Sequence, residues 1–552
     1  MDERDTLIAS TDEPQRAIRL AISLLVCLGL ASALIVTTFQ RISFAIGGVI
    51  ALGSAAVLSI RYLDSRYDGK LAHALVGVLL LVWFATTPIF SFWFRIPLDR
   101  TIISYDRMIF ALVLIIVFLR RVRKPGSERH FRVTGFEIAW SLLCVVALLS
   151  VAAKSSNVGY ATRIAVDSFV LPLIAFHLAR NHFDTDRYGK ALLFAVGAVV
   201  LVLFVTGAFE YTSGSNLFQY KGSELIRDGE YRVNGPFASD SSYAIVSLIL
   251  ALFLSVAPRI LNIRLDNGAR VLHAAVFAAG LGASLMPLFR VVAAALAISW
   301  FVLEVGASDS RHGARSKKNA ELDEAFRNGN SRFSRTGRAL WMTATRVIIA
   351  AALIILVLVK WDAISGAASA EQRLLSPNSM YGRLATWEAA ITIAANHPFI
   401  GVGLCNYTDS FNAEYEEKSR LLKPDLELVV SDSPHSNILW VAAELGVVGV
   451  IPYLAANLFL LWMGCRALKR AKNTQSRVSA AMFIALLMAY SIPGIALTSG
   501  AYSDLNLYSF FLLGLLSRRM QHQRSEEKPR VHQDVQAELH EPAVGQPILG
   551  LR

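Results

Sequence analysis

Apolar residues in this chain gather into blocks of roughly 16–24 residues, the length that a helix needs to cross the hydrocarbon core of a bilayer. A dozen or more such helices could not all be buried in a soluble core. The pattern therefore predicts an all-α, polytopic integral membrane protein with a large external loop that contains short helices. We expect about 14 transmembrane helices, at residues 17–39, 42–60, 71–92, 104–119, 136–153, 164–179, 190–209, 241–257, 271–288, 291–305, 340–360, 436–463, 479–497 and 504–517.

The composition supports this class. The chain of 552 residues is 54% hydrophobic and 17% charged, whereas soluble domains average about 25% charged residues. The net charge of +12 comes from basic residues clustered between apolar blocks. Positive-inside topology explains this charge better than nucleic-acid binding, so no nucleic-acid partner is expected. Of the four cysteines only Cys405 falls in a predicted external loop, so we expect no external disulfide framework, and no motif indicates a metal or another cofactor.

Loop charge sets the predicted orientation. With the N-terminus inside, the strongly basic loops all fall on the cytoplasmic side and the alternate loops are much less basic. The first apolar block is too long for a signal-peptide core, so we interpret it as a retained span. The predicted order is a cytoplasmic N-terminus (1–16), N-terminal transmembrane helices (17–209), an external loop (210–240), transmembrane helices (241–305), a flexible cytoplasmic loop (306–339), a transmembrane helix (340–360), a large external loop (361–435), C-terminal transmembrane helices (436–517) and a disordered cytoplasmic tail (518–552).

A histidine and an acid stand where the large external loop enters the next span. His435 follows Pro434 at the water–membrane boundary, where an imidazole can exchange a proton near neutral pH or direct charge toward a phosphate. The alternative is a histidine that simply snorkels at a helix end. Glu444 lies two turns deeper, on the opposite helix face from His435. We expect Glu444 to anchor the helix to a neighbour by a hydrogen bond, with a functional role as the alternative.

Two arginines stand beside apolar sequence in the predicted external region. Arg383 belongs to an amphipathic helix at 381–395, whose apolar residues, including Leu384, Trp387 and Ile391, predict a helix lying flat at the interface. Its guanidinium could bind a diphosphate in bidentate fashion or simply meet lipid phosphates. Arg290 occupies a tight apolar turn between two spans, where an arginine costs a few kcal/mol on insertion scales. A turn of this kind does not need the charge, so Arg290 indicates function.

The first external loop offers a further cation. Arg232 lies in RDGEYRVNGPFASDSSYA, where Gly235 and Pro236 predict a turn and the Ser/Asp run predicts a helix cap. Arg232 either joins a cationic cluster or is an ordinary exposed loop residue. With Arg290, Arg383 and His435 it would form an external site that suits an anionic, lipid-linked substrate. The acids of the large loop are dispersed, so spacing does not identify a general base.

Three segments in order, GRLATW, HPFIGVGLCNY and PHSNILWVAAELGVVG, resemble the bacterial O-antigen ligase and polymerase superfamily. The likeness covers roughly Arg290 to Tyr453, and the spans before it match only as generic membrane helices. One departure is that Ser436 directly follows the helix-entry histidine, where the family often has asparagine. The matching positions are Arg383, Trp387, His397, Pro398, Gly401, Gly403, His435, Glu444, Gly446 and Gly449.

The resemblance implies a metal-independent, inverting glycosyltransferase of the bacterial inner membrane, acting at its periplasmic face. The donor would be a glycan on undecaprenyl diphosphate, and the acceptor a growing glycan or lipid A–core. The external arginines would bind the diphosphate, and His435 would assist its departure or activate the acceptor hydroxyl. Membrane lipids, a flippase and chain-length regulators are the partners that such an enzyme would have.

Three activities within that family remain open at this stage. A polymerase joins repeat units of exopolysaccharide or O-antigen, a ligase transfers finished glycan to lipid A–core, and a protein O-oligosaccharyltransferase glycosylates serine or threonine. The estimate of about 14 spans, against 12 usual for ligases, favours the polymerase. A lipid-linked glycan flippase is the alternative from another class, but it needs a polar path through the membrane centre, and most ionisable residues here stand at span ends.

Overall fold

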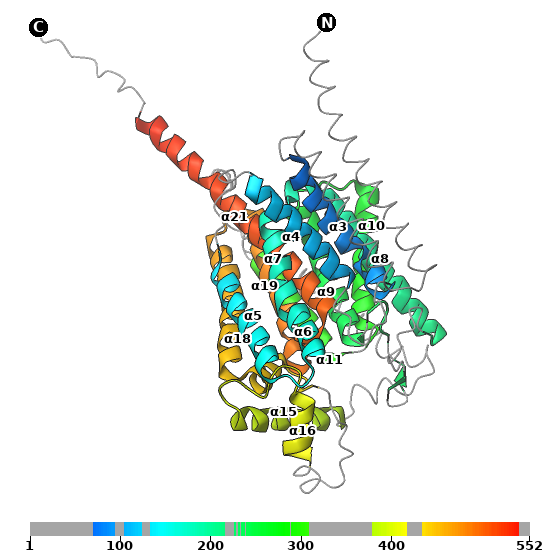
Figure 1. The fold of residues 1–552 in the computed structure, drawn as a ribbon. Coiled ribbons are helices and arrows are strands. Elements are labelled where there is room, and N and C mark those ends of the chain that lie inside the picture. The colour runs from blue at the N-terminus through cyan, green and yellow to red at the C-terminus, as the bar shows by residue number, and fades with distance from the viewer. Residues whose placement is uncertain are drawn as a thin grey trace, which may run out of the picture.

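The computed structural model describes residues 70–93, 104–123, 133–215, 226–227, 230–231, 233–237, 239–287, 289–308, 378–416 and 433–539, and these form a bundle of long helices (Figure 1). The described residues contain a single short β-ladder, in which β1 (Ile226–Arg227) pairs antiparallel with β2 (Glu230–Tyr231). The remaining elements are helical: α3 Lys70–Trp93, α4 Tyr105–Arg123, α5 Gly135–Lys154, α6 Val158–Ala165, η1 Val166–Val170, α7 Leu171–His182, α8 Thr185–Ser213, α9 Asp240–Ile260, α10 Asn267–Leu285, α11 Arg290–Ser308, α15 Asn378–Asn396, α16 Tyr407–Phe411, η2 Asn412–Glu416, α18 Asn437–Arg470, α19 Thr474–Ser491, α20 Pro493–Ala496, η3 Ser499–Ala501 and α21 Ser503–Leu539.

The all-α membrane class is confirmed, because eight helical stretches among the described residues are long and apolar enough to cross a bilayer. They coincide with the predicted spans between 136 and 305 and between 436 and 497. The predicted spans 71–92, 104–119 and 504–517 correspond to α3, α4 and the first part of α21. The predicted spans 17–39, 42–60 and 340–360, and most of the predicted cytoplasmic loop 306–339, lie outside the described residues, so the total of about 14 stays a prediction.

The C-terminal segment differs from the prediction. Helix α21 continues through residue 517 to Leu539, so residues 518–539 are helical where the sequence predicts the start of a cytoplasmic tail. The sequence RRMQHQRSEEKPRVHQDVQAEL is rich in Arg, Gln, Glu and Lys, which favour helix, and the existing helix spares it the cost of nucleation, although Pro529 opposes helix in its interior.

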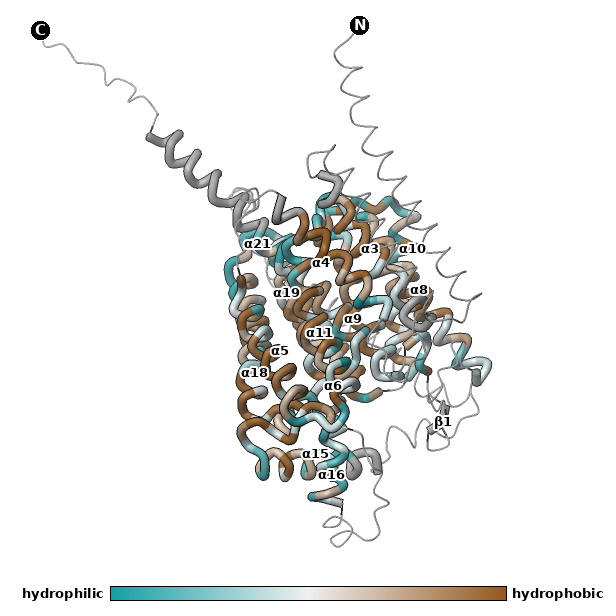
Figure 2. Tube along the Cα trace, viewed as in Figure 1, coloured by the Kyte–Doolittle hydropathy of each residue, from teal (hydrophilic) through white to brown (hydrophobic). Residues whose placement is uncertain are grey.

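The bundle is organised around α9 and α19, whose most apolar segments are 83% and 78% buried, whereas those of α10 and α11 are only 22% and 33% buried. Figure 2 shows hydrophobic residues along the length of the bundle and hydrophilic residues at its two ends. Such a distribution fits central helices packed by protein and peripheral helices that face lipid. We call the end that carries residues 397–409 and 433–437 the loop end, and the opposite one, which carries Glu137, the Glu137 end.

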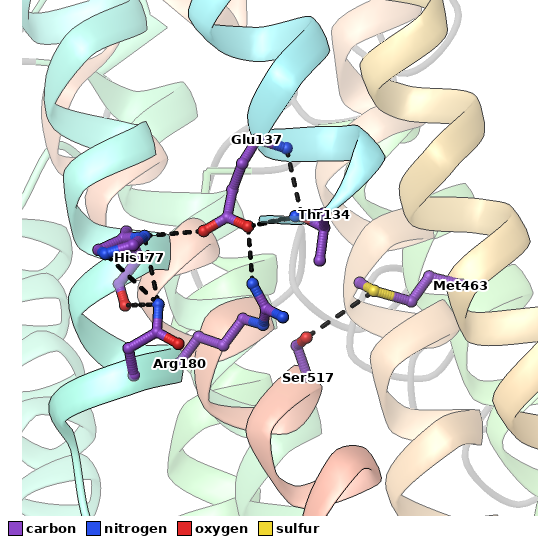
Figure 3. A network of polar contacts seen from close by, with 7 residues as sticks. Thr134, Glu137, His177, Arg180, Met463 and Ser517 are labelled. Atoms are coloured by element: carbon purple, nitrogen blue, oxygen red, sulfur yellow. Dashed lines mark hydrogen bonds and ion pairs between the residues drawn. The ribbon is translucent and has the colours of Figure 1, made fainter. Parts of the chain in front are cut away.

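A polar network joins α5 and α7 at the Glu137 end (Figure 3), and a further bond adds α21 to it. Glu137 and Thr134 form a capping box at the start of α5, and the Glu137 carboxylate also accepts hydrogen bonds from Arg180 Nη1 at 2.6 Å and from the His177 ring at 2.8 Å. Arg518 of α21 donates to the backbone carbonyl of Asn181 at 3.1 Å. Polar contacts thus fix the end that loop charge predicts to be cytoplasmic.

We expect Glu137→Ala to destabilise the protein by about 3 kcal/mol or more, because it leaves the Arg180 guanidinium buried without its carboxylate. Glu137→Gln is the matched control: it keeps an acceptor for the cap and loses only the charge, so its effect should be smaller. Thermal unfolding of the two purified variants in the same detergent measures the difference. Equal melting temperatures for Glu137→Ala and the wild type would contradict the interpretation.

Candidate functional site

Helix α18 is broken at Gly446, and the segment HPFIGVG crosses the break. Gly446 has φ 63° and ψ −163°, which no helix contains. Beyond the break, the amides of Val447 and Val448 donate to the carbonyls of Pro398 and Phe399, at 2.8 and 3.2 Å. In an unbroken helix these amides would donate to the carbonyls of residues 443 and 444.

The segment HPFIGVGLCNY, residues 397–407, which we call the crossing loop, also donates hydrogen bonds to the carbonyls that the break leaves without helical partners. The amide of Val402 donates to Ala443 O at 3.0 Å, and that of Gly403 donates to Glu444 O at 2.9 Å. Two lost helical bonds are thus replaced by four bonds to the loop, so loop and helix are one unit. Glycine is required on both sides of the crossing: a Cβ at Gly401 would collide with the backbone at Glu444, and a Cβ at Gly446 with the backbone of the loop.

The end of α5 holds the other flank of the same loop. Lys154 Nζ donates to Gly401 O at 2.7 Å, and Ser155 Oγ donates to Leu404 O at 2.8 Å. The Asn406 side chain donates to Lys154 O at 2.8 Å and accepts from the Ser156 amide at 3.1 Å. The loop is therefore clamped between two membrane helices far apart in the sequence, and its position relative to the bundle is fixed.

Glu444 anchors this arrangement by a hydrogen bond, as the sequence predicted. Its side chain is buried, and its Oε1 accepts from the backbone amide of Tyr407 at 3.3 Å. The Tyr407 hydroxyl in turn donates to the carbonyl of Thr386 in α15, at 3.1 Å. A small apolar cluster lies around these contacts, formed by Ala389, Ala390, Ile393, Tyr407, Phe411, Tyr415 and Ala443.

The loop also contains Cys405, which is half-buried. Burial, with a smaller contribution from the nearby Glu444 charge, raises the pKa of the Cys405 thiol well above its ordinary value. The thiol is therefore protonated at neutral pH and is not an activated nucleophile.

His435 adopts a backbone conformation that is uncommon for residues other than glycine. Its φ is 50°, and it lies just before Ser436, the N-cap residue of α18. The indole N–H of Trp387 donates to the His435 carbonyl at 3.4 Å. Strained residues of this kind persist only when their surroundings hold them, and they are concentrated at functional sites. The His435 side chain itself is half-buried, at the loop end of the bundle.

Asn437 fixes the chain on the other side of His435. It is buried; its side-chain N–H donates to Ser499 Oγ at 3.0 Å, and its Oδ1 accepts from the Gly500 amide at 2.7 Å. Asn506 continues the network by donating to Gly500 O at 2.7 Å. The turn between α19 and α21 thus holds the entrance of α18 in register with His435.

Helix α15 brings Arg383 to the same end. It lies across the loop end of the bundle (Figure 1), and Arg383 stands one turn before Trp387, whose indole contacts His435. The face that α15 buries is not its most apolar one. Small residues pack inward, Ala385, Ala389 and Ala390 among them, whereas the predicted interfacial residues Leu384 and Ile391 are exposed. Small side chains allow this helix to approach α18 closely.

Arg290 is the first residue of α11, in the turn after α10 as the sequence predicted, and its side chain is exposed. Helix α20 packs against α11 and also against α18, and its residue Gly494 adjoins the Asn437 side chain. Arg290, Arg383 and His435 therefore belong to elements that meet at one end of the bundle.

Arg232 lies outside the described residues, but the turn that follows it is described. The Glu210 carboxylate, fully buried at the end of α8, accepts through Oε2 from the amides of Asn234 and Gly235, at 2.9 and 2.8 Å. The predicted turn at Gly235 is confirmed, as is the cap, because Ser239 caps α9. Sequence reasoning missed Glu210, as it missed Lys154 and Tyr407, because their partners are backbone groups distant in the chain.

Residues 292–454 match the model of the O-antigen ligase family. The matched range agrees with the extent of the resemblance predicted from the motifs, and it contains Arg383, the crossing loop, His435 and the break in α18. Comparison with curated proteins finds no match to this chain. Within the described residues no three His, Cys, Asp or Glu side chains are grouped so as to hold a metal ion.

Proposed function

Because residues 292–454 carry the domain of the O-antigen ligase/polymerase superfamily, we propose that this protein transfers an undecaprenyl-diphosphate-linked glycan at the periplasmic face of the bacterial inner membrane. The observation that carries the proposal is the meeting of Arg290, Arg383 and His435 at one end of an apolar helix bundle. A substrate with a prenyl chain, a diphosphate and a glycan needs apolar, cationic and aqueous surroundings in that order. The loop end combines an apolar bundle, two arginines and a polar loop.

The proposed reaction is an inverting glycosyl transfer. An acceptor hydroxyl attacks the anomeric carbon, the bond from that carbon to the diphosphate oxygen breaks, and undecaprenyl diphosphate leaves with the bonding electron pair. Arg290 and Arg383, with Arg232, would bind the diphosphate and stabilise the charge that develops on it. His435 would accept the proton of the hydroxyl or donate one to the departing diphosphate. Guanidinium groups would take the role that a divalent cation has in other phosphate chemistry.

Polymerisation of exopolysaccharide or O-antigen repeat units is the activity we favour. The preference rests on the predicted total of about 14 spans, of which 11 have counterparts among the described residues, eight as candidate spans and three as further helices. Transfer of finished glycan to lipid A–core is the alternative. A flippase that works with the enzyme and a chain-length regulator would be its functional partners.

A glycan profile of a strain that lacks this gene, with and without the wild-type gene restored, tests the function. Lipopolysaccharide, secreted polysaccharide and lipid-linked intermediates are analysed together. In the strain without the gene we expect single repeat units in place of long chains, and we expect long chains to return when the gene is restored. Long polymer stranded on the lipid carrier beside bare core would establish the ligase instead. Purified protein in proteoliposomes separates the remaining class, since a transferase releases undecaprenyl diphosphate and a flippase moves its substrate unchanged.

A further inference from the structure

Two large apolar side chains form the tip of the crossing loop without being covered by the protein. Phe399 is 72% exposed and Ile400 is 54% exposed. Their exposure does not come from a freely placed loop, because the carbonyls of Pro398 and Phe399 accept from Val447 and Val448 and the Gly401 carbonyl accepts from Lys154. The fold therefore presents this pair of side chains at a fixed position.

The tip is continuous with the outward-facing stripe of α18. The Val447 and Val448 side chains, whose amides bond to the loop, are exposed, and the stripe continues about one and three turns further along the helix, through Ile451 and Leu458. In a membrane protein this stripe faces the acyl chains. The hydrogen bonds from Val447 and Val448 place Phe399 and Ile400 beside the loop-end residues of this stripe.

The other end of the stripe gives the depth. Trp462 is exposed, and the Arg466 guanidinium lies 4.7 Å from the centre of its ring, a pairing typical of a membrane–water interface. From Trp462 to Val447 the helix rises about 22 Å, at about 1.5 Å per residue. The hydrocarbon core of a bilayer is about 30 Å thick. Val447, and with it the tip of the loop, therefore lies within the thickness of the bilayer.

Non-helical backbone is tolerated at such depth only if its polar groups are bonded within the protein. The crossing loop meets this condition at most of its backbone: the carbonyls of residues 398, 399 and 401 and the amides of residues 401–404 all have partners in the structure. Bonds to the break in α18 and to the end of α5 supply most of them.

We infer that Phe399 and Ile400 form a wedge inserted among the acyl chains of the outer leaflet, so that this loop is anchored both in the protein and in the bilayer. The partner is the bilayer lipid itself, chosen because the wedge is continuous with the lipid-facing stripe of α18. The inference needs only a membrane protein with this loop, and it stands whether or not the protein transfers glycans.

Spin labels placed by cysteine substitution test the wedge in liposomes. A background with all four native cysteines replaced, Cys405 by serine, receives Phe399→Cys or Ile400→Cys and a nitroxide label. Collision with molecular oxygen, which concentrates in the bilayer, is compared with collision with a water-soluble nickel chelate. Two labels calibrate the scale. Ile451→Cys lies on the stripe of α18, and Ala413→Cys is exposed on η2, which follows the crossing loop in the chain. A single size-exclusion peak and a wild-type melting temperature show that each variant is folded.

We expect the labels at 399 and 400 to be severalfold more accessible to oxygen than to the nickel chelate, as at 451, and the reverse at 413. Nickel accessibility at 399 and 400 equal to that at 413 would overturn the inference, because the tip would then be in water. The expected preference for oxygen combined with a strongly immobilised label at 399 would also overturn the inference, since it would indicate that another protein surface, not lipid, covers the tip.

Discussion

Replacing His435 by asparagine is expected to lower the rate of glycan transfer by about 10²- to 10⁴-fold, the usual contribution of a positioned acid or base. Asparagine is the informative substitution because it tolerates positive φ better than most residues, so the backbone at φ 50° can be kept while the imidazole is lost. The measurement is the release of undecaprenyl diphosphate by purified protein in nanodiscs, with kcat and KM determined separately. A loss confined to kcat is expected for a group that acts on the reacting atoms.

A second positive-φ residue provides the control. Asn262 has φ 54° at the Glu137 end of the bundle, far from the proposed site. Asn262→Ala introduces backbone strain without touching His435 and should leave transfer unchanged. Arg383→Lys is the complementary test, because it keeps the charge and removes the planar fork, and it should act mainly on KM for the lipid-linked donor. If His435→Asn transferred at the wild-type rate, the site assignment would be wrong even though the family match stands.

The helices of the bundle could be predicted from the sequence because a membrane span needs only length and apolarity. The predicted spans 136–153 and 190–209, for example, lie inside α5 and α8. Sequence also gave the expectation that Glu444 forms an anchoring hydrogen bond, since a carboxylate within a span must find a partner. The identity of that partner, the amide of Tyr407, depends on a contact across 37 residues and could not be derived.

The break in α18 could not be predicted from the sequence for a related reason. The run AAELGVVGVIPYL reads as an unbroken apolar span, and glycine is common in membrane helices. Gly401 of HPFIGVG and Gly446 of ELGVVG are explained only when the two segments cross, because each leaves out a Cβ that would collide with the backbone of the other segment. The buried face of α15 shows the same limit. Apolar size indicates Leu384 and Ile391 as the interfacial face, and both are exposed, but it gives no sign that the alanines of this helix pack inward against the protein.

The crossing itself yields the second large expectation. Gly446→Ala should destabilise the protein by about 3 kcal/mol or more: φ 63° with ψ −163° is a region almost confined to glycine, where another residue costs about 1–3 kcal/mol. The new Cβ also meets the backbone of Phe399 and Gly401, which cannot turn aside as a side chain would. The clash is relieved only if the crossing loop moves away from the break, and the four hydrogen bonds between loop and helix are then lost.

Gly214→Ala separates the clash from the strain. Gly214 ends α8 at φ 65°, and a Cβ there would meet no atom within 4 Å, so its cost should be limited to about 1–2 kcal/mol of left-handed strain. Melting temperatures of the two variants give the comparison, and hydrogen exchange of the peptides around 402–403 and 447–448 reports the crossing directly. Because the crossing loop is joined to α15 and through it to Trp387 and the His435 carbonyl, Gly446→Ala should also reduce glycan transfer at least about 100-fold, as a misplaced site does. Equal melting temperatures and equal hydrogen exchange in the two variants would contradict this expectation. They would mean that the crossing loop docks without the break in α18, and that the four hydrogen bonds between loop and helix do not hold the site in place.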